Sequence, residues 1–141
     1  MHYLRILHNG DLRKDSPKPS PHWTVLVHED GRIVGEVLMR EWSRWSLPKD
    51  FQIPEHSRFF DIPPELTAQD HLTTSPHFED LIVSLMRGDG RRNCTFLMSQ
   101  LPEGCRLHSA LADLLQKIGE IVEAVPVEKR RRRSLTSREA V

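Results

Sequence analysis

Five consecutive cationic side chains near the end of the chain are the residues with the clearest chemistry in this sequence. They are Lys129, Arg130, Arg131, Arg132 and Arg133. Clustered groups of this kind neutralise phosphates and release the counterions that surround a nucleic acid. The sequence therefore predicts a nucleic-acid-associated protein, with RNA favoured over DNA, that reads the shape and backbone of its partner.

The cationic run divides a chain of zero net charge into two oppositely charged parts. Residues 129–141 hold six basic side chains and one acidic one, so they carry +5 and residues 1–128 carry −5. Basic stretches also act as nuclear-targeting signals, dock on acidic proteins or membranes, or stay solvated. These alternatives stay open, as does docking on the acidic part of the same chain.

A serine follows the arginines directly, at Ser134. Basic-directed kinases prefer this pattern, and a phosphate there would add about −1.5 to −2 units of charge. We expect such a phosphate to weaken binding to other phosphates.

A tryptophan pair flanked by arginines is the second candidate for contact with a nucleic acid. Trp42 and Trp45 lie three positions apart, beside Arg40 and Arg44. On one helical turn the rings would share a face and stack on bases while the arginines hold phosphates. The favoured interpretation is nevertheless a core or protein-interface role, which is the usual one for tryptophan in a small domain.

The histidines and cysteines do not have the spacing of a metal site. The least implausible ligand set is His71, His77, Cys94 and Cys105, which lacks the closely spaced pairs of a structural zinc site. We expect free thiols at the two cysteines.

No catalytic motif is found either. Residues 88–92 read Gly-Asp-Gly-Arg-Arg, which lacks the Gly-Lys-Ser/Thr ending of a phosphate-binding loop and follows a predicted helix. We therefore predict a protein without enzymatic activity, cofactor or metal.

The elements that position these residues belong to one modest domain. The chain has 141 residues, 38% of them hydrophobic and ten of them proline, which suits one small core with long connections. We expect a single domain over residues 1–126, with a proline-rich connector over 9–21, and a flexible basic tail over 127–141. No apolar run is long enough for a membrane span and the chain start lacks the order of a signal peptide, so a soluble, intracellular protein is expected.

A hairpin over residues 22–39 is the clearest local signal. Asp30 and Gly31 separate two β-rich runs, and Asp-Gly supplies the positive φ that a tight turn requires. The pair is expected to bury one face, formed by Trp23, Val25, Val27, Ile33, Val37 and Met39. Further strands are predicted over residues 2–8 and 93–99, and a short one over 58–62.

Two helices are predicted. The first covers residues 76–87, because Ser75 and Pro76 are typical of a helix start and Gly88 of a helix end. Its buried stripe would be Phe78, Leu81, Ile82, Leu85 and Met86.

The last helix, over residues 107–125, has the strongest periodicity. Apolar residues are spaced alternately four and three apart, at Leu107, Leu111, Leu114, Ile118, Ile121 and Val125. This stripe would pack either on the chain's own sheet or against a second copy, because the spacing suits both. The alternative function is therefore an adaptor or regulator that pairs with a protein, or with itself as a homodimer, through this helix, the basic tail then serving as a targeting or docking signal.

Together these elements predict an α+β fold. It is a small, mainly antiparallel sheet centred on the 22–39 hairpin, with two or three helices packed on one face. By analogy of fold and composition alone, the leading prediction is a compact RNA-binding accessory protein of the kind found in viruses.

Overall fold

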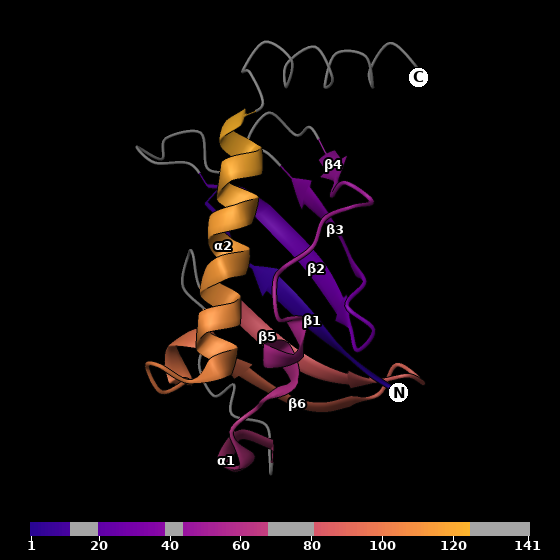
Figure 1. Ribbon diagram of the computed structural model, residues 1–141, viewed down its shortest axis with the longest axis vertical. Helices are drawn as coiled ribbons and strands as arrows, with labels where there is room; N and C mark the ends of the chain where they lie inside the picture. The colour runs from indigo at the N-terminus through magenta and orange to yellow at the C-terminus, as the bar shows by residue number, and fades with distance from the viewer. Residues whose placement is uncertain (12–19, 39–43, 68–80, 125–141) are drawn as a thin grey trace.

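The computed structural model describes residues 1–11, 20–38, 44–67 and 81–124, and shows an α+β fold with one six-stranded antiparallel sheet and one main helix (Figure 1). The strands are β1 (His2–His8), β2 (His22–His28), β3 (Ile33–Leu38), β4 (Arg44–Ser46), β5 (Leu81–Arg87) and β6 (Arg92–Leu97). The helices are η1 (His56–Phe60), α1 (Pro64–Thr67), η2 (Met98–Gln100) and α2 (Arg106–Ala124). In this part of the chain, no helix is long and apolar enough to cross a membrane.

The N-terminal strand lies in the middle of the sheet. The strand order is β4-β3-β2-β1-β5-β6, and every neighbouring pair is antiparallel. Ile6 of β1 therefore stands between Val25 of β2 and Val83 of β5. All three side chains are fully buried, so β1 joins the two hairpins β2–β3 and β5–β6 through one continuous apolar row.

The core lies between the sheet and α2, which runs across one face of it (Figure 1). Leu107, Leu111, Leu114 and Ile118 of α2 are at most 1% exposed. They pack against the alternate inward side chains of the strands, such as Leu4 of β1. The first four residues of the predicted apolar stripe are thus buried within their own chain, Ile121 is half-buried, and Val125 lies outside the described residues.

Both predicted strands of the 22–39 hairpin are confirmed. Gly31 has φ of 93°, and the N–H of Gly31 donates to the carbonyl of His28 over 2.9 Å. The inward residues of β2 and β3 are buried as expected, whereas Met39 lies outside the described residues. The strand predicted over 2–8 is confirmed as β1. The one predicted over 93–99 is confirmed as far as residue 97 in β6, whereas residues 98–99 belong to the 3-10 helix η2.

The helix predicted over residues 76–87 is wrong where the structure describes it. Residues 81–87 form β5, which pairs with β1 along its whole length, and Gly88 begins a turn and does not cap a helix. β5 is buried on both faces, so its apolar residues are nearly continuous in sequence, and such a run fits the helical period as well as the strand period. The predicted start, residues 75–80, lies outside the described residues.

Two further expectations need correction. Residues 58–62 do not form a strand, because residues 56–60 form the 3-10 helix η1, in which the N–H of Arg58 donates to the Glu55 carbonyl. The prediction of two or three helices on one face is more than the structure shows, because α2 is the one main helix described and α1 has only four residues.

Candidate functional site

The outer edge of β3 is covered by β4 along only part of its length. Residues 36–38 pair with β4, and the last bond along this edge joins the N–H of Leu47 to the Gly35 carbonyl over 2.9 Å. The next residue is Pro48, which has no N–H and cannot continue the ladder. The chain therefore leaves the sheet at this point.

The part of the edge that β4 leaves unpaired lies at Ile33, a residue that is 3% exposed. The Arg32 carbonyl accepts the His28 N–H over 2.9 Å, so the polar backbone atoms of Arg32 face β2. Backbone groups alternate in direction along a strand, so the N–H and carbonyl of Ile33 face the outer edge. Among the described residues, no strand pairs with this position.

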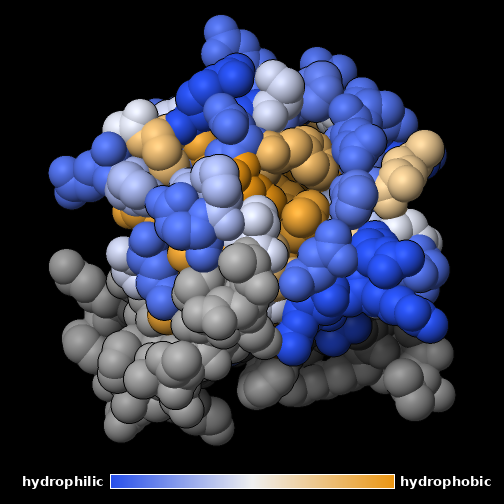
Figure 2. Space-filling view, turned by 90° about the horizontal axis from the view of Figure 1, so that it is seen from below, coloured by the Kyte–Doolittle hydropathy of each residue, from blue (hydrophilic) through white to orange (hydrophobic). Residues whose placement is uncertain are grey.

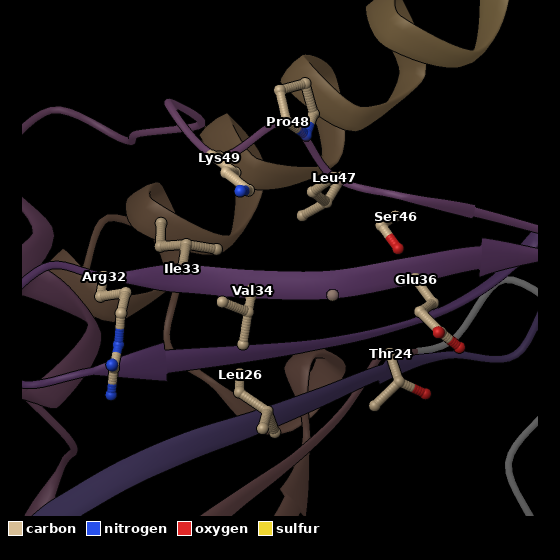
Figure 3. Close-up of a pocket in the computed structure, with 11 residues that line it drawn as sticks. Thr24, Leu26, Arg32, Ile33, Val34, Glu36, Ser46, Leu47, Pro48 and Lys49 are labelled. Carbon is tan, nitrogen blue, oxygen red and sulfur yellow. The ribbon is translucent and has the colours of Figure 1, made fainter.

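A groove of about 650 Å³ lies beside this edge (Figure 3). We call it the β3-edge groove. Its apolar lining comes from β2, β3 and the residues after β4, and consists of Leu26, Ile33, Val34, Leu47 and Pro48. Its polar lining includes Arg32 and Lys49 from the two sides of β3, and Glu36 and Ser46 farther along β3 and β4. A volume of this size is typical of a ligand site.

The face of the sheet turned away from α2 is open beside the groove. Val34 stands opposite Leu26 on this face and is 44% exposed. Leu7 of β1 faces the same side and is 36% exposed. Apart from Met1, these two are the exposed large apolar side chains of the described residues. Their position on one face suggests a surface that a partner covers.

The same face is closed over the other hairpin. Ser84 of β5 and Thr95 of β6 are about as buried as the core, at 2% and 1% exposure, and their hydroxyl oxygens lie 3.0 Å apart. The two halves of one sheet therefore differ in whether their second face reaches solvent.

A second hollow, of about 490 Å³, adjoins the groove and shares Arg32, Ile33 and Lys49 with it. Its wall also includes Asp30, whose Oδ1 accepts the N–H of Arg32 over 2.9 Å. This hydrogen bond, helped by the nearby charge of Arg32, holds the pKa of Asp30 below its usual value. Asp30 is therefore an anion at neutral pH that is already engaged by its own turn.

The wall opposite β3 is held in place by α2. Residues 47–53 bury Leu47, Phe51 and Ile53 in the core. The ammonium of Lys117 on α2 donates to the carbonyl of Gln52 and lies 5.2 Å from the centre of the Phe51 ring. We call residues 47–53 the strap. Its attachment to α2 fixes the width of the groove before any ligand arrives.

Hydrogen bonds from Arg58 anchor η1 to α2. Arg58 is 9% exposed; its Nη2 donates to Asp113 Oδ2 and to the Pro54 carbonyl, both over 2.7 Å, and its Nη1 donates to Ser109 Oγ over 2.9 Å. These bonds satisfy a nearly buried guanidinium, so we assign Arg58 a structural role.

Most of the predicted nucleic-acid contacts lie outside the described residues. These are Lys129, Arg130, Arg131, Arg132, Arg133, Arg40 and Trp42, together with the predicted phosphosite Ser134. Arg44 is exposed on β4, with its Nε 4.0 Å from a carboxylate oxygen of Glu36. Trp45 is 8% exposed and belongs to the core. A buried ring does not present a stacking platform, so the described part of the pair agrees with the core interpretation.

The remaining candidates do not come together. His71, His77 and Val125 lie outside the described residues. Cys94 is buried and Cys105 is half-buried, and both are free thiols. In the described ranges, no group of three or more potential ligands is placed to hold a metal ion.

The end of the molecule near α1 shows apolar side chains in its middle, with hydrophilic ones around much of them (Figure 2).

Sequence reasoning missed the residues of the β3-edge groove, above all Arg32, Val34 and Lys49. One signal was present: Leu26 and Val34 are apolar positions on the outward face of a hairpin whose inward face is also apolar. A strand with two apolar faces needs cover on both.

No family model, no curated protein and no solved structure matches this chain. Its function must therefore be inferred from its own geometry.

Proposed function

We propose that this protein is an interaction module that binds an extended segment of a partner polypeptide along the open edge of β3. The observation that carries the proposal is that, among the described residues, no strand pairs with the edge at Ile33, which lies beside an apolar groove. A peptide added as a strand would bond to the N–H and carbonyl of Ile33, a residue that is 3% exposed, and place alternate side chains into the groove.

The described part of the chain pairs with most of this edge and leaves one short stretch of it unpaired, which supports the proposal. Proteins usually protect sheet edges with bulges, charges, proline or covering segments, because an open edge pairs with other chains. Here β4 and Leu47 cover part of the edge, and the strap turns away at Pro48 just before Ile33. The opening is short, which favours one defined segment over indiscriminate pairing.

This proposal keeps the predicted adaptor role but moves its surface. The adaptor was expected to pair through the last helix. Because Leu107, Leu111, Leu114 and Ile118 are buried in the core, a second copy would meet them only if α2 left its own sheet. The β3-edge groove needs no such rearrangement.

The test begins with peptides selected from a random library on the wild-type protein. Each backbone N–H of a selected peptide is then methylated in turn, and affinity is measured by isothermal titration calorimetry. Strand addition predicts that methylation abolishes binding at one position, that of the amide that donates to the Ile33 carbonyl, and is tolerated at the neighbouring positions, whose amides point away from β3. Equal sensitivity at all positions, or no effect of Val34→Asp on affinity, would contradict the proposal.

A second candidate function is the nucleic-acid association predicted from the basic tail. The observation that favours it is the charge of +5 on residues 129–141. Four or five phosphate contacts would give a slope of about −3.5 to −4.5 in a plot of log affinity against log salt on duplex DNA. Filter binding with the full chain and with residues 129–141 deleted tests it, and unchanged affinity after the deletion would rule it out.

A further inference from the structure

We infer that the partner segment is acidic, with a carboxylate beside its apolar residues that Arg32 and Lys49 recognise together. This inference rests on the proposed function, since it specifies the chemistry of the segment that would lie along β3. It draws on the charges that line the β3-edge groove.

The two cations of the groove form no close ion pair with a carboxylate of the described residues, although the charge of Arg32 lies near Asp30. Arg32 and Lys49 are both exposed, and both line the groove and the adjoining hollow. Neither forms an ion pair within 4.0 Å with another described residue. In Figure 3 Arg32 lies just before β3 and points away from Lys49, which lies on the strap on the other side of β3.

The nearby anions, in contrast, are occupied. Asp30 accepts the N–H of its own turn. Glu36, farther along β3, lies 4.0 Å from the guanidinium of Arg44. Among the residues that line the end nearest the β2–β3 turn, the two cations Arg32 and Lys49 stand against one anion, Asp30, which leaves a local excess of one positive charge.

The protein has a second Asp-Gly-Arg turn, in which the arginine lies close to a carboxylate. The lack of a close ion pair at Arg32 is therefore not a property of the turn sequence. Residues 89–91 repeat the sequence of residues 30–32, and the N–H of Arg91 donates to Asp89 Oδ1 over 3.0 Å, as Arg32 does to Asp30. There, however, Arg91 lies 3.8 Å and Arg87 3.5 Å from Asp89 Oδ2. Arg91 is thus a matched control for Arg32.

An apolar floor strengthens this recognition. Val34 and Leu26 line the same groove as the two cations, and a bound peptide would exclude water from these apolar side chains. A charge-assisted bond gains strength as water is removed, provided that both charges are paired. A single acid reaching both cations would also fix the register of the strand.

Other occupants suit these charges less well. The basic run at residues 129–133 of the same chain would be repelled by Arg32 and Lys49. A second copy, pairing edge to edge, would bring its own Arg32 and Lys49 to the groove. A foreign segment with acidic and apolar residues fits best.

The experiment uses three fluorescein-labelled hexapeptides in which valine alternates with glutamate, glutamine or lysine. Binding to the full chain is measured by fluorescence polarisation. We expect the glutamate peptide to bind about tenfold more tightly than the glutamine peptide, and the lysine peptide most weakly. Because the carboxylate contacts are partly exposed, the preference should shrink in 1 M salt, where the Debye length is about 3 Å.

Charge variants separate the inference from its premise. Arg32→Gln/Lys49→Gln should remove the preference, Arg32→Glu/Lys49→Glu should reverse it, and Arg91→Glu should leave it unchanged. Urea unfolding of each variant checks that the fold is intact.

Equal binding of all three peptides by the wild type would overturn the charge inference while the proposed function stands. If none of the peptides binds more tightly to the wild type than to Val34→Asp, both fail. Sedimentation would then show whether a second copy occupies the edge.

Discussion

The hairpins β2–β3 and β5–β6 are built on the same turn but meet different surroundings. In both, an Asp-Gly-Arg turn bonds the aspartate to the arginine N–H, and the glycine has positive φ, 93° at Gly31 and 86° at Gly90. Yet the second face of β5–β6 is closed and its arginine lies within 4.0 Å of a carboxylate, whereas that of β2–β3 is open and its arginine forms no ion pair that close with a described residue. The turn sequence is enough to form a hairpin in both places. The elements packed around each hairpin decide whether its second face is exposed.

The largest effect is expected from exchanging polar and apolar residues on the two second faces. Thr95→Val leaves the buried Ser84 hydroxyl without its partner, at a cost of about 1–3 kcal/mol in the free energy of unfolding. Val34→Thr, the reverse change on the open face, should alter it by less than about 0.5 kcal/mol. Urea denaturation measures both, and equal losses would mean that the two faces do not differ.

The glycines of the two turns should rank next. An alanine with positive φ costs about 1–2 kcal/mol, so both Gly31→Ala and Gly90→Ala are expected to destabilise the protein. Gly31→Ala should cost more, because its Cβ would lie 2.9 Å from the His56 ring, whereas nothing lies within 4 Å at Gly90. A thermal melt in which Gly90→Ala is the less stable variant would break the comparison.

A smaller effect should follow from releasing the strap, which lies beside the β2–β3 hairpin. Lys117→Met removes the bond to the Gln52 carbonyl and the contact with Phe51, at a cost of less than about 1 kcal/mol. Affinity for the glutamate peptide should nevertheless fall, because the groove wall is no longer fixed. Gln116→Met, on the same helix, is the control and should leave affinity unchanged.

The smallest effect concerns pH. The pKa of Asp30 is lowered in the folded state by the Arg32 N–H and by the charges of Arg32, His28 and His56, so its ionised form stabilises the fold. This contribution is present at neutral pH and is lost as the pH falls through the lowered pKa, below about pH 4. The stability difference between wild type and Asp30→Asn should shrink over that range. A difference that stays constant down to pH 2 would show that the carboxylate plays no such role.

The two hairpins also show what the sequence could and could not predict. The β2–β3 pair was predictable because two runs rich in β-forming residues flank a turn signal, Asp30-Gly31. Residues 81–87 carry apolar side chains on both faces, so their spacing fits a helix as well as a strand. Asp89-Gly90 and the β-branched pair Ile82-Val83 were the signals that favoured a second hairpin.

The candidate site was beyond local sequence patterns. It depends on where the short strand β4 leaves β3, and on how Lys117, some sixty-five residues away, holds the strap. The pairing of β1 with β5 is equally remote, since it joins residues 2–8 to 81–87. Local periodicity carries no information on such distant contacts, although it correctly predicted that the last helix has one apolar face.

The bonds of Arg58 have a consequence for the order of assembly in the cell. Its guanidinium reaches partners 51 and 55 positions later in the chain, both on α2. During translation the earlier segments leave the ribosome first, and until residues 106–124 follow, this charge lacks its acceptors on α2 and the sheet lacks its cover. A nascent chain stalled before that point should therefore be a substrate for chaperones or proteases, and completion of this fold should wait until residues 106–124 have been synthesised.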